Sequence, residues 1–235
     1  MNSRKTTVDF SNVLTSDDAS ILLIKLTTLL SKNTNSLLHE RSHFYQDINN
    51  LESNLSKHSD FQDLQSSDNE YQATEALIKL FNSLFVDQRV QLIRAEVEPE
   101  YFPASIDNFA RIEFAHGFFA SALHEISHWC IASKARRQLS DFGYWYAADG
   151  RNEAQQRAFE RVEIKPQALE CLFTLACRRP FQVSQDNLFA NYDASNSSFA
   201  NDVYQQVKTY LNEPQKIPLD AQRLLQVLLT ITISL

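Results

Sequence analysis

His124 and His128 lie four residues apart in the pentapeptide HEISH, and Glu125 follows the first of them. Successive residues of an α-helix are about 100° apart around its axis, so these imidazoles would lie about 40° apart and could reach one metal ion. A helix over residues 118–139 is predicted, because alanine and leucine are frequent there and proline is absent. Buried imidazoles need partners for both ring nitrogens, and a divalent cation supplies one. The alternative is a pair of ordinary core histidines. Glu125 argues against it, since a buried carboxylate is rare without a partner.

A second pentapeptide of the same pattern, HERSH, occupies residues 39–43. Apolar residues recur at helical spacing along one side of this stretch, at Leu37, Phe44, Ile48, Leu51 and Leu55. On such a helix His39 and His43 would fall on the opposite, polar face, and Arg41 would place a cation between them. We interpret this copy as a coincidence of sequence and expect the metal at HEISH.

Two histidines hold a metal weakly, and the third ligand is usually a carboxylate. The acidic candidates downstream are Asp141, Glu160, Glu163 and Glu170. Glu163 is favoured because it lies in the short apolar segment VEI, just before a helix expected to start at Pro166, where an acid would be buried and need a cation. Glu170, one turn into that helix, is the second choice.

The same ligand set serves different chemistries. With zinc, two histidines and a carboxylate leave one position for water, and Glu125 would be the general base of a peptidase. With iron(II), about three positions stay open for dioxygen and substrate, and Glu125 would orient a ligand or water. A purely structural metal would need a fourth protein ligand, such as His116. The residues by themselves leave these three alternatives open.

Composition limits the class of protein. A chain of 235 residues can form one sizeable domain with appendages, and only 3 glycines predict few tight turns and a mainly helical fold. The net charge of −7 predicts no general affinity for nucleic acid. No apolar run approaches the roughly 20 residues that span a bilayer, and the N-terminus lacks the apolar core of a signal peptide. We expect a cytoplasmic protein whose cysteines, Cys130, Cys171 and Cys177, are reduced core thiols.

The periodicity of apolar residues predicts an α+β fold that is predominantly helical, with the HEISH helix packed on a small sheet and a helical extension at the N-terminus. The expected helices are 17–31, 37–64, 71–85, 118–139, 152–161, 166–178, 199–211 and 219–231, and the expected strands are 90–97 and 110–115. The predicted division is an N-terminal extension of unknown role (1–70), a metal-dependent domain (71–211) and a C-terminal helical tail (212–235).

The sequence resembles a known family over a long segment. The block FAHGFFASALHEISHWCIASKARRQLSDFGYWYAADGR, followed by VEIKPQAL and PFQVSQDNL, is similar to the bacterial elongation factor P hydroxylases. The resemblance runs from near Tyr71 to roughly Leu211 and does not include residues 1–70 or the C-terminal tail. It implies a non-haem, metal-dependent hydroxylase of the modified, β-lysylated lysine of elongation factor P. The implied centre has two histidines and one carboxylate, carried over to His124, His128 and Glu163, with iron(II) as metal and dioxygen as cosubstrate.

Further residues are candidates for supporting roles. Glu125 is the catalytic candidate and would orient water or move protons. His116, Tyr144 and Trp145 are candidates for surrounding the site or touching substrate, although such aromatic residues more often serve as core. A basic cluster of Lys134, Arg136 and Arg137, with Arg178 and Arg179, could dock an acidic protein substrate. A solvated helix end explains that cluster equally well. The oligomeric state and the electron donor cannot be inferred from these residues.

Overall fold

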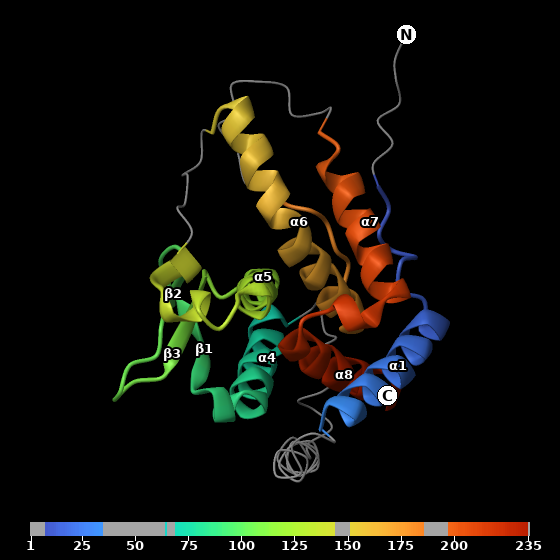
Figure 1. Cartoon of the computed structure of the whole chain (residues 1–235), viewed down its shortest axis with the longest axis horizontal. Helices are drawn as coiled ribbons and strands as arrows, with labels where there is room; N and C mark the ends of the chain where they lie inside the picture. Colours follow the sequence, from blue (N-terminus) through green and yellow to red (C-terminus); the bar gives the residue numbers. More distant parts are fainter. Residues whose placement is uncertain (1–7, 35–63, 65–68, 144–150, 186–196, 235) are drawn as a thin grey trace.

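The computed structural model describes residues 8–34, 64, 69–143, 151–185 and 197–234. Its helices are α1 (Ser16–Thr34), α4 (Glu70–Leu84), α5 (Phe119–Ile131), α6 (Glu153–Ala176), α7 (Phe199–Asn212) and α8 (Leu219–Ser234), and its strands are β1 (Val90–Ala95), β2 (Glu100–Phe102) and β3 (Ala110–Ala115). Figure 1 shows α4 and α5 beside the sheet, and α6, α7, α8 and α1 on the side away from it. The predicted α+β, predominantly helical fold is confirmed. The predicted stretch 37–64, including HERSH, lies outside the described residues except for Leu64.

The sheet has three strands in the order β1-β3-β2. β1 is parallel to β3, with Val90 opposite Ala110, and the short β2, which was not predicted, is antiparallel to β3. Ile112 and Phe114 of β3 are buried, as their alternation with polar residues predicts. α4 packs on β1 and α5 packs on β3, so the helix that carries HEISH lies on the sheet as expected.

A tight turn and two side chains from elsewhere set the start of α5. Gly117 has a φ of +72°, and a Cβ there would lie 2.1 Å from the guanidinium of Arg94, which donates to the Gly117 carbonyl. The positive φ favours glycine at this position, and a Cβ would also displace the Arg94 guanidinium. The N-cap residue of α5, Phe118, makes no side-chain cap, and Glu70 of α4 instead accepts from the amide of Phe119 at 2.7 Å. Arg179 binds the other oxygen of the Glu70 carboxylate.

α5 ends at Ile131, eight residues before the predicted end of the helix. Ala132 is extended, and the chain then turns so that Arg137 folds back over the helix. The Arg137 guanidinium lies 3.8 Å from the ring centroid of Trp129, donates to the Trp129 carbonyl and pairs with Asp220 of α8 at 2.7 Å. This tertiary ion pair prevails over the local helix preference of residues 132–139.

α6 is one continuous helix, whereas the sequence predicted a short helix (152–161), an extended segment (162–165) and a new helix from Pro166. A proline inside a helix removes one hydrogen bond and costs about 3 kcal/mol. Burial of the apolar residues that follow offsets this cost. Four of them are almost completely buried: Ala168, Leu169, Leu172 and Phe173. The prediction of a break was wrong because it considered the proline without the packing.

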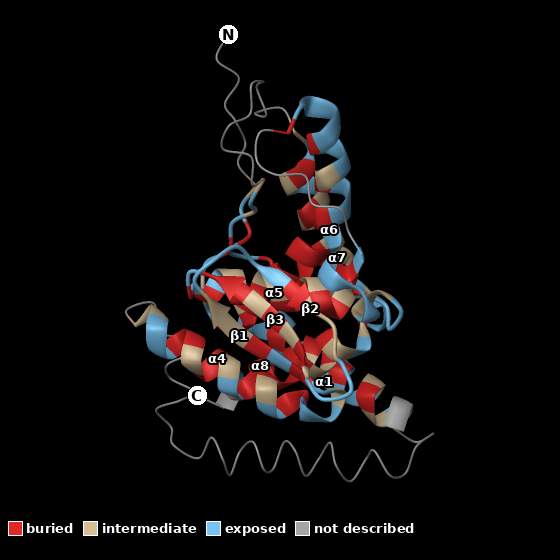
Figure 2. Ribbon diagram, turned by 90° about the vertical axis from the view of Figure 1, so that its left-hand side faces the viewer, coloured by how far each residue is buried: buried red, intermediate tan, exposed pale blue. Residues whose placement is uncertain are grey.

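α8, predicted as part of a C-terminal tail, packs into the same core as the other helices. Its residues Leu224, Leu225, Leu228 and Leu229 are almost completely buried, and the helix contacts α1, α5 and α6. Figure 2 shows the buried residues of these elements gathered on their inward faces. Among the described helices, none has the length and apolar character needed to cross a membrane.

This packing predicts a large effect of truncating Leu225. We expect Leu225→Ala to lower the free energy of unfolding by about 2–5 kcal/mol, because it leaves a cavity at a fully buried position. The matched control is Leu219→Ala in the same helix, whose side chain is 51% exposed and whose effect should stay within about 0.5 kcal/mol. Chemical denaturation of both variants measures the difference. Equal effects would show that α8 does not belong to the core.

Candidate metal centre

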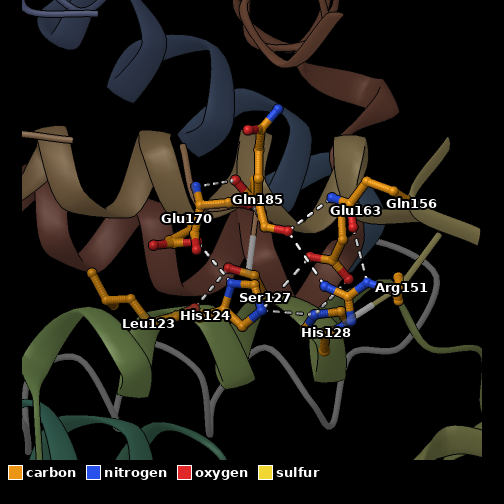
Figure 3. A network of polar contacts seen from close by, with 11 residues as sticks. Leu123, His124, Ser127, His128, Arg151, Gln156, Glu163, Glu170 and Gln185 are labelled. Atoms are coloured by element: carbon orange, nitrogen blue, oxygen red, sulfur yellow. Dashed lines mark hydrogen bonds and ion pairs between the residues drawn. The ribbon is translucent and has the colours of Figure 1, made fainter. Parts of the chain in front are cut away.

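His124 and His128 face Glu163 across the contact between α5 and α6 (Figure 3). The Nε2 atoms of the two histidines lie 3.1 Å apart. The Glu163 carboxylate oxygens lie 3.3 Å from Nε2 of His128 and 3.7 Å from Nε2 of His124. The three residues thus each offer a ligand atom within 4.8 Å of the others. The structure brings together the three residues that the sequence proposed as ligands.

These spacings suit a single ion. Two ligand atoms about 2.1 Å from one metal lie about 3.0 Å apart at a right angle and about 3.4 Å apart in a tetrahedron. The Glu163 side chain is only 5% exposed, and its Oε2 atom is buried without a hydrogen-bond partner. An unpartnered buried acceptor costs about 1–3 kcal/mol, and a cation at this position would remove that cost. The residues therefore fit a divalent metal.

Glu170, the second choice for the third ligand, contacts the other side of the His124 ring. Its Oε2 accepts from Nδ1 of His124 at 2.8 Å, while Nε2 of His124 faces His128 and Glu163. The two carboxylates occupy one face of α6 because they are seven residues, or two helical turns, apart. Their shared helix, which the sequence prediction had broken at Pro166, places them on opposite sides of one imidazole.

The charges around the site shift the pKa values of its residues in opposite directions. Burial alone would lower the pKa of His124, but its hydrogen bond to Glu170 and the charges of Glu170, Glu163 and Glu125 raise it to about 10. Burial alone would raise the pKa of Glu163, but the charges of the two histidines and the His128 hydrogen bond lower it to about 2. Burial raises the pKa of Glu125. Metal binding would compete with protonation of His124, because a cation needs the neutral imidazole.

Comparison with known proteins connects this geometry to a family. The sequence model of the family described as Elongation factor P hydroxylase matches residues 80–232, which is more than half of the chain. The chain belongs to the elongation factor P hydroxylase family. Over 138 aligned residues it is 46% identical to the elongation factor P lysine hydroxylase of Haemophilus influenzae. The alignment covers 58% of this chain and 77% of that relative. The resemblance found in the sequence is confirmed, and the match also includes α8.

The remaining acidic candidates of this family member have other partners. Asp141 accepts from the backbone amide of Tyr101 at 3.0 Å. Glu160 accepts from Gln185 and Ser197, at 3.2 and 2.8 Å. Neither belongs to the group of three that the structure brings together. Asp141 and Glu160 thus bond other parts of the fold. The packing of α6 against α5 determines which of the four acidic candidates faces the two histidines.

Two of the four supporting candidates, His116 and Glu125, lie within the described residues. His116 is exposed on the turn before α5, with its ring beside that of Phe118, and is not among the three converging residues. Glu125 is half-buried next to His124. Tyr144 and Trp145 lie outside the described residues. The roles proposed for these four residues stay predictions.

The basic cluster divides into exposed and internal members. Lys134 is exposed, whereas Arg136 donates to the Phe142 carbonyl and Arg137 binds Asp220 and Trp129. The described contacts of Arg137 hold the end of α5 against α8. A docking role therefore stays a prediction, and Lys134 and Arg178 are the exposed members of the cluster.

The sequence prediction missed a buried polar stripe along α6. Its members are spaced four, three, four, three and four residues apart and are each at most 9% exposed: Gln156, Glu160, Glu163, Gln167, Glu170 and Thr174. This is the spacing of one helical face. Gln167 bonds both backbone groups of Ser184, and the Gln156 amide donates to the carbonyl of Gln185. The spacing is present in the sequence, but it was not recognised because two separate helices, rather than one, were expected on either side of Pro166.

Proposed function

We propose that this protein hydroxylates the modified, β-lysylated lysine of elongation factor P, and that His124, His128 and Glu163 hold the metal that the reaction needs. Membership of the family and the name of the Haemophilus influenzae relative support the reaction and the substrate. The observation that carries the site assignment is the convergence of the three ligand atoms within 4.8 Å, around a buried and unpartnered oxygen of Glu163. A cytoplasmic location would follow from a substrate that acts in translation.

Iron(II) in such a site would supply the activation of dioxygen: one oxygen atom enters a substrate C–H bond, and the other becomes water with two protons and two electrons from an added reductant. The protein side chains bind and orient. His124 and His128 keep 27% and 21% of their side-chain surface exposed, so the site is open to solvent on one side. A long lysine side chain can approach the metal from that side.

The direct test is mass spectrometry of elongation factor P that carries the modified lysine. The factor is incubated with this protein, iron(II) and a reductant in air, and parallel samples lack oxygen or the metal. We expect a gain of one oxygen atom on the modified lysine in the complete reaction alone. An unchanged mass with folded, metal-loaded protein would refute the proposed function.

Glu125→Gln separates this function from a zinc peptidase, which would use the same three ligands. In the hydroxylase Glu125 is not a ligand, so we expect the variant to keep its metal and a measurable part of its hydroxylation. In a zinc peptidase Glu125 would be the general base, and its loss would lower turnover by about 10²–10⁴-fold. Metal analysis and the hydroxylation rate are measured together. Complete loss of hydroxylation with the metal retained would contradict the supporting role of Glu125.

A further inference from the structure

We propose that Glu170 is a positioning residue of the metal centre: it holds the His124 ring with Nδ1 protonated and Nε2 directed at the metal. This inference rests on the metal site of the proposed function. Glu170 is then not itself a metal ligand but the hydrogen-bond partner of the ligand His124.

The contacts place Glu170 behind the His124 ring. Its Oε2 lies 2.8 Å from Nδ1 of His124, while Nε2 of the same ring lies 3.1 Å from Nε2 of His128 and 3.7 Å from Glu163. The two nitrogens of an imidazole point away from each other, so one atom of the ring faces Glu170 and the other faces the site. Figure 3 shows Glu170 and Glu163 at different ends of this cluster.

The arrangement of the two helices explains this pairing. Glu163 and Glu170 are seven residues apart, which is about 10.5 Å along α6, and His124 and His128 are about 6 Å apart along α5. The earlier histidine of α5, His124, bonds the later acid of α6, Glu170, whereas the later histidine, His128, lies nearest to the earlier acid, Glu163. The two helices therefore run in opposite directions where they meet. Glu163 therefore faces the Nε2 atoms of both histidines, whereas Glu170 meets Nδ1 of His124, so the two acids do not fill the same ligand position.

Hydrogen bonding decides which nitrogen of His124 can bind a cation. An ionised carboxylate only accepts hydrogen bonds, so Nδ1 must carry the proton in a bond to Glu170. In a neutral imidazole the other nitrogen, Nε2, then keeps its lone pair for the metal. The same bond fixes the rotation of the ring and makes Nε2 a stronger donor to the cation. The two negative charges of Glu163 and Glu170 also balance the charge of a divalent ion.

Glu170 lies on the packed face of α6. Its side chain is 12% exposed, against 27% for His124, and it belongs to the buried polar stripe of α6. Other members of that stripe bond the segment with Ser184 and Gln185. A carboxylate fixed on a packed helix can orient a ligand more accurately than one on a loop.

The test measures metal affinity by competition of Co(II) between the protein and a chelator. We expect Glu170→Ala to weaken Co(II) binding about 10–100-fold, the usual effect of losing the hydrogen-bond partner of a histidine ligand. Glu170→Gln keeps an oxygen that can accept from Nδ1 but loses the charge, so its effect should be smaller. The matched control is Glu160→Gln, which changes a buried carboxylate of the same stripe that bonds Gln185 and Ser197, and its affinity should equal that of the wild type.

Two further readouts separate positioning from other roles. In the Zn(II)-loaded wild type, long-range proton–nitrogen NMR should find the His124 proton on Nδ1, and Glu170→Ala should make this proton exchange faster with solvent because its hydrogen-bond partner is lost. If Glu170 were itself a ligand, Glu170→Ala would lose Co(II) as completely as Glu163→Ala and would change the visible spectrum of the bound ion.

Complete loss of Co(II) from Glu170→Ala, with a changed visible spectrum, would overturn the inference. Two folded Glu170 variants that bind Co(II) like the wild type would also overturn it. None of these measurements uses hydroxylation. A wild-type protein that binds Co(II) but leaves elongation factor P unchanged would therefore refute the proposed function and not the role of Glu170.

Discussion

Glu163→Ala is expected to abolish metal binding and hydroxylation together. Glu163 is the proposed carboxylate ligand of the site, and its unpartnered Oε2 is the atom whose burial calls for a cation. Loss of a ligand's hydrogen-bond partner commonly costs about 10–100-fold in metal affinity, so loss of a direct ligand should cost more than about 100-fold. Metal content after dialysis and the mass gain of elongation factor P measure the two effects.

The variants must be shown to be folded. Glu163→Ala removes a buried charge that faces both histidines, so its thermal unfolding has to be measured beside that of Glu163→Gln, which keeps the size of the side chain. Glu160→Ala is the matched control, because it removes another buried acid from the same face of α6 and should keep its metal. If folded Glu163→Gln bound metal as tightly as the wild type, Glu163 could not be a ligand.

His128→Ala should have an effect of the same size, whereas His43→Ala should have almost none. Both histidines close an H-E-x-x-H pentapeptide; a carboxylate of α6 reaches His128 of HEISH, whereas HERSH lies outside the described residues. Removing Nε2 of His128 deletes one of the three converging atoms and should lower metal affinity more than about 100-fold.

The paired variants turn the choice between the two pentapeptides into one measurement. His43→Ala changes the same residue type at the same motif position, so it controls for the general effect of removing a histidine. Metal stoichiometry and hydroxylation are compared for the two proteins under identical conditions. A loss of metal in His43→Ala equal to that in His128→Ala would contradict the assignment of the site to HEISH.

Much of the fold could be predicted because it depends on local pattern. The helices at 71–85, 199–211 and 219–231 were located to within a few residues, and the alternation of residues 110–115 predicted β3. The end of α5 and the continuity of α6 through Pro166 were not predicted. The pairing of Arg137 with Asp220 involves residues 83 positions apart, and the burial that compensates Pro166 depends on neighbouring helices. Such contacts leave no signal in a short window of sequence.

The sequence by itself determined that two imidazoles project from one side of one helix, because a spacing of four residues has that consequence in any α-helix. It also indicated a nearby acid without deciding which one, since six carboxylates follow within 50 residues and four of them are candidate ligands. Only the tertiary structure decided that Glu163 faces both histidines and that Glu170 accepts a hydrogen bond from Nδ1 of His124. The physical reason is that helical periodicity acts between near neighbours, whereas the choice of partner depends on how α6 packs across α5.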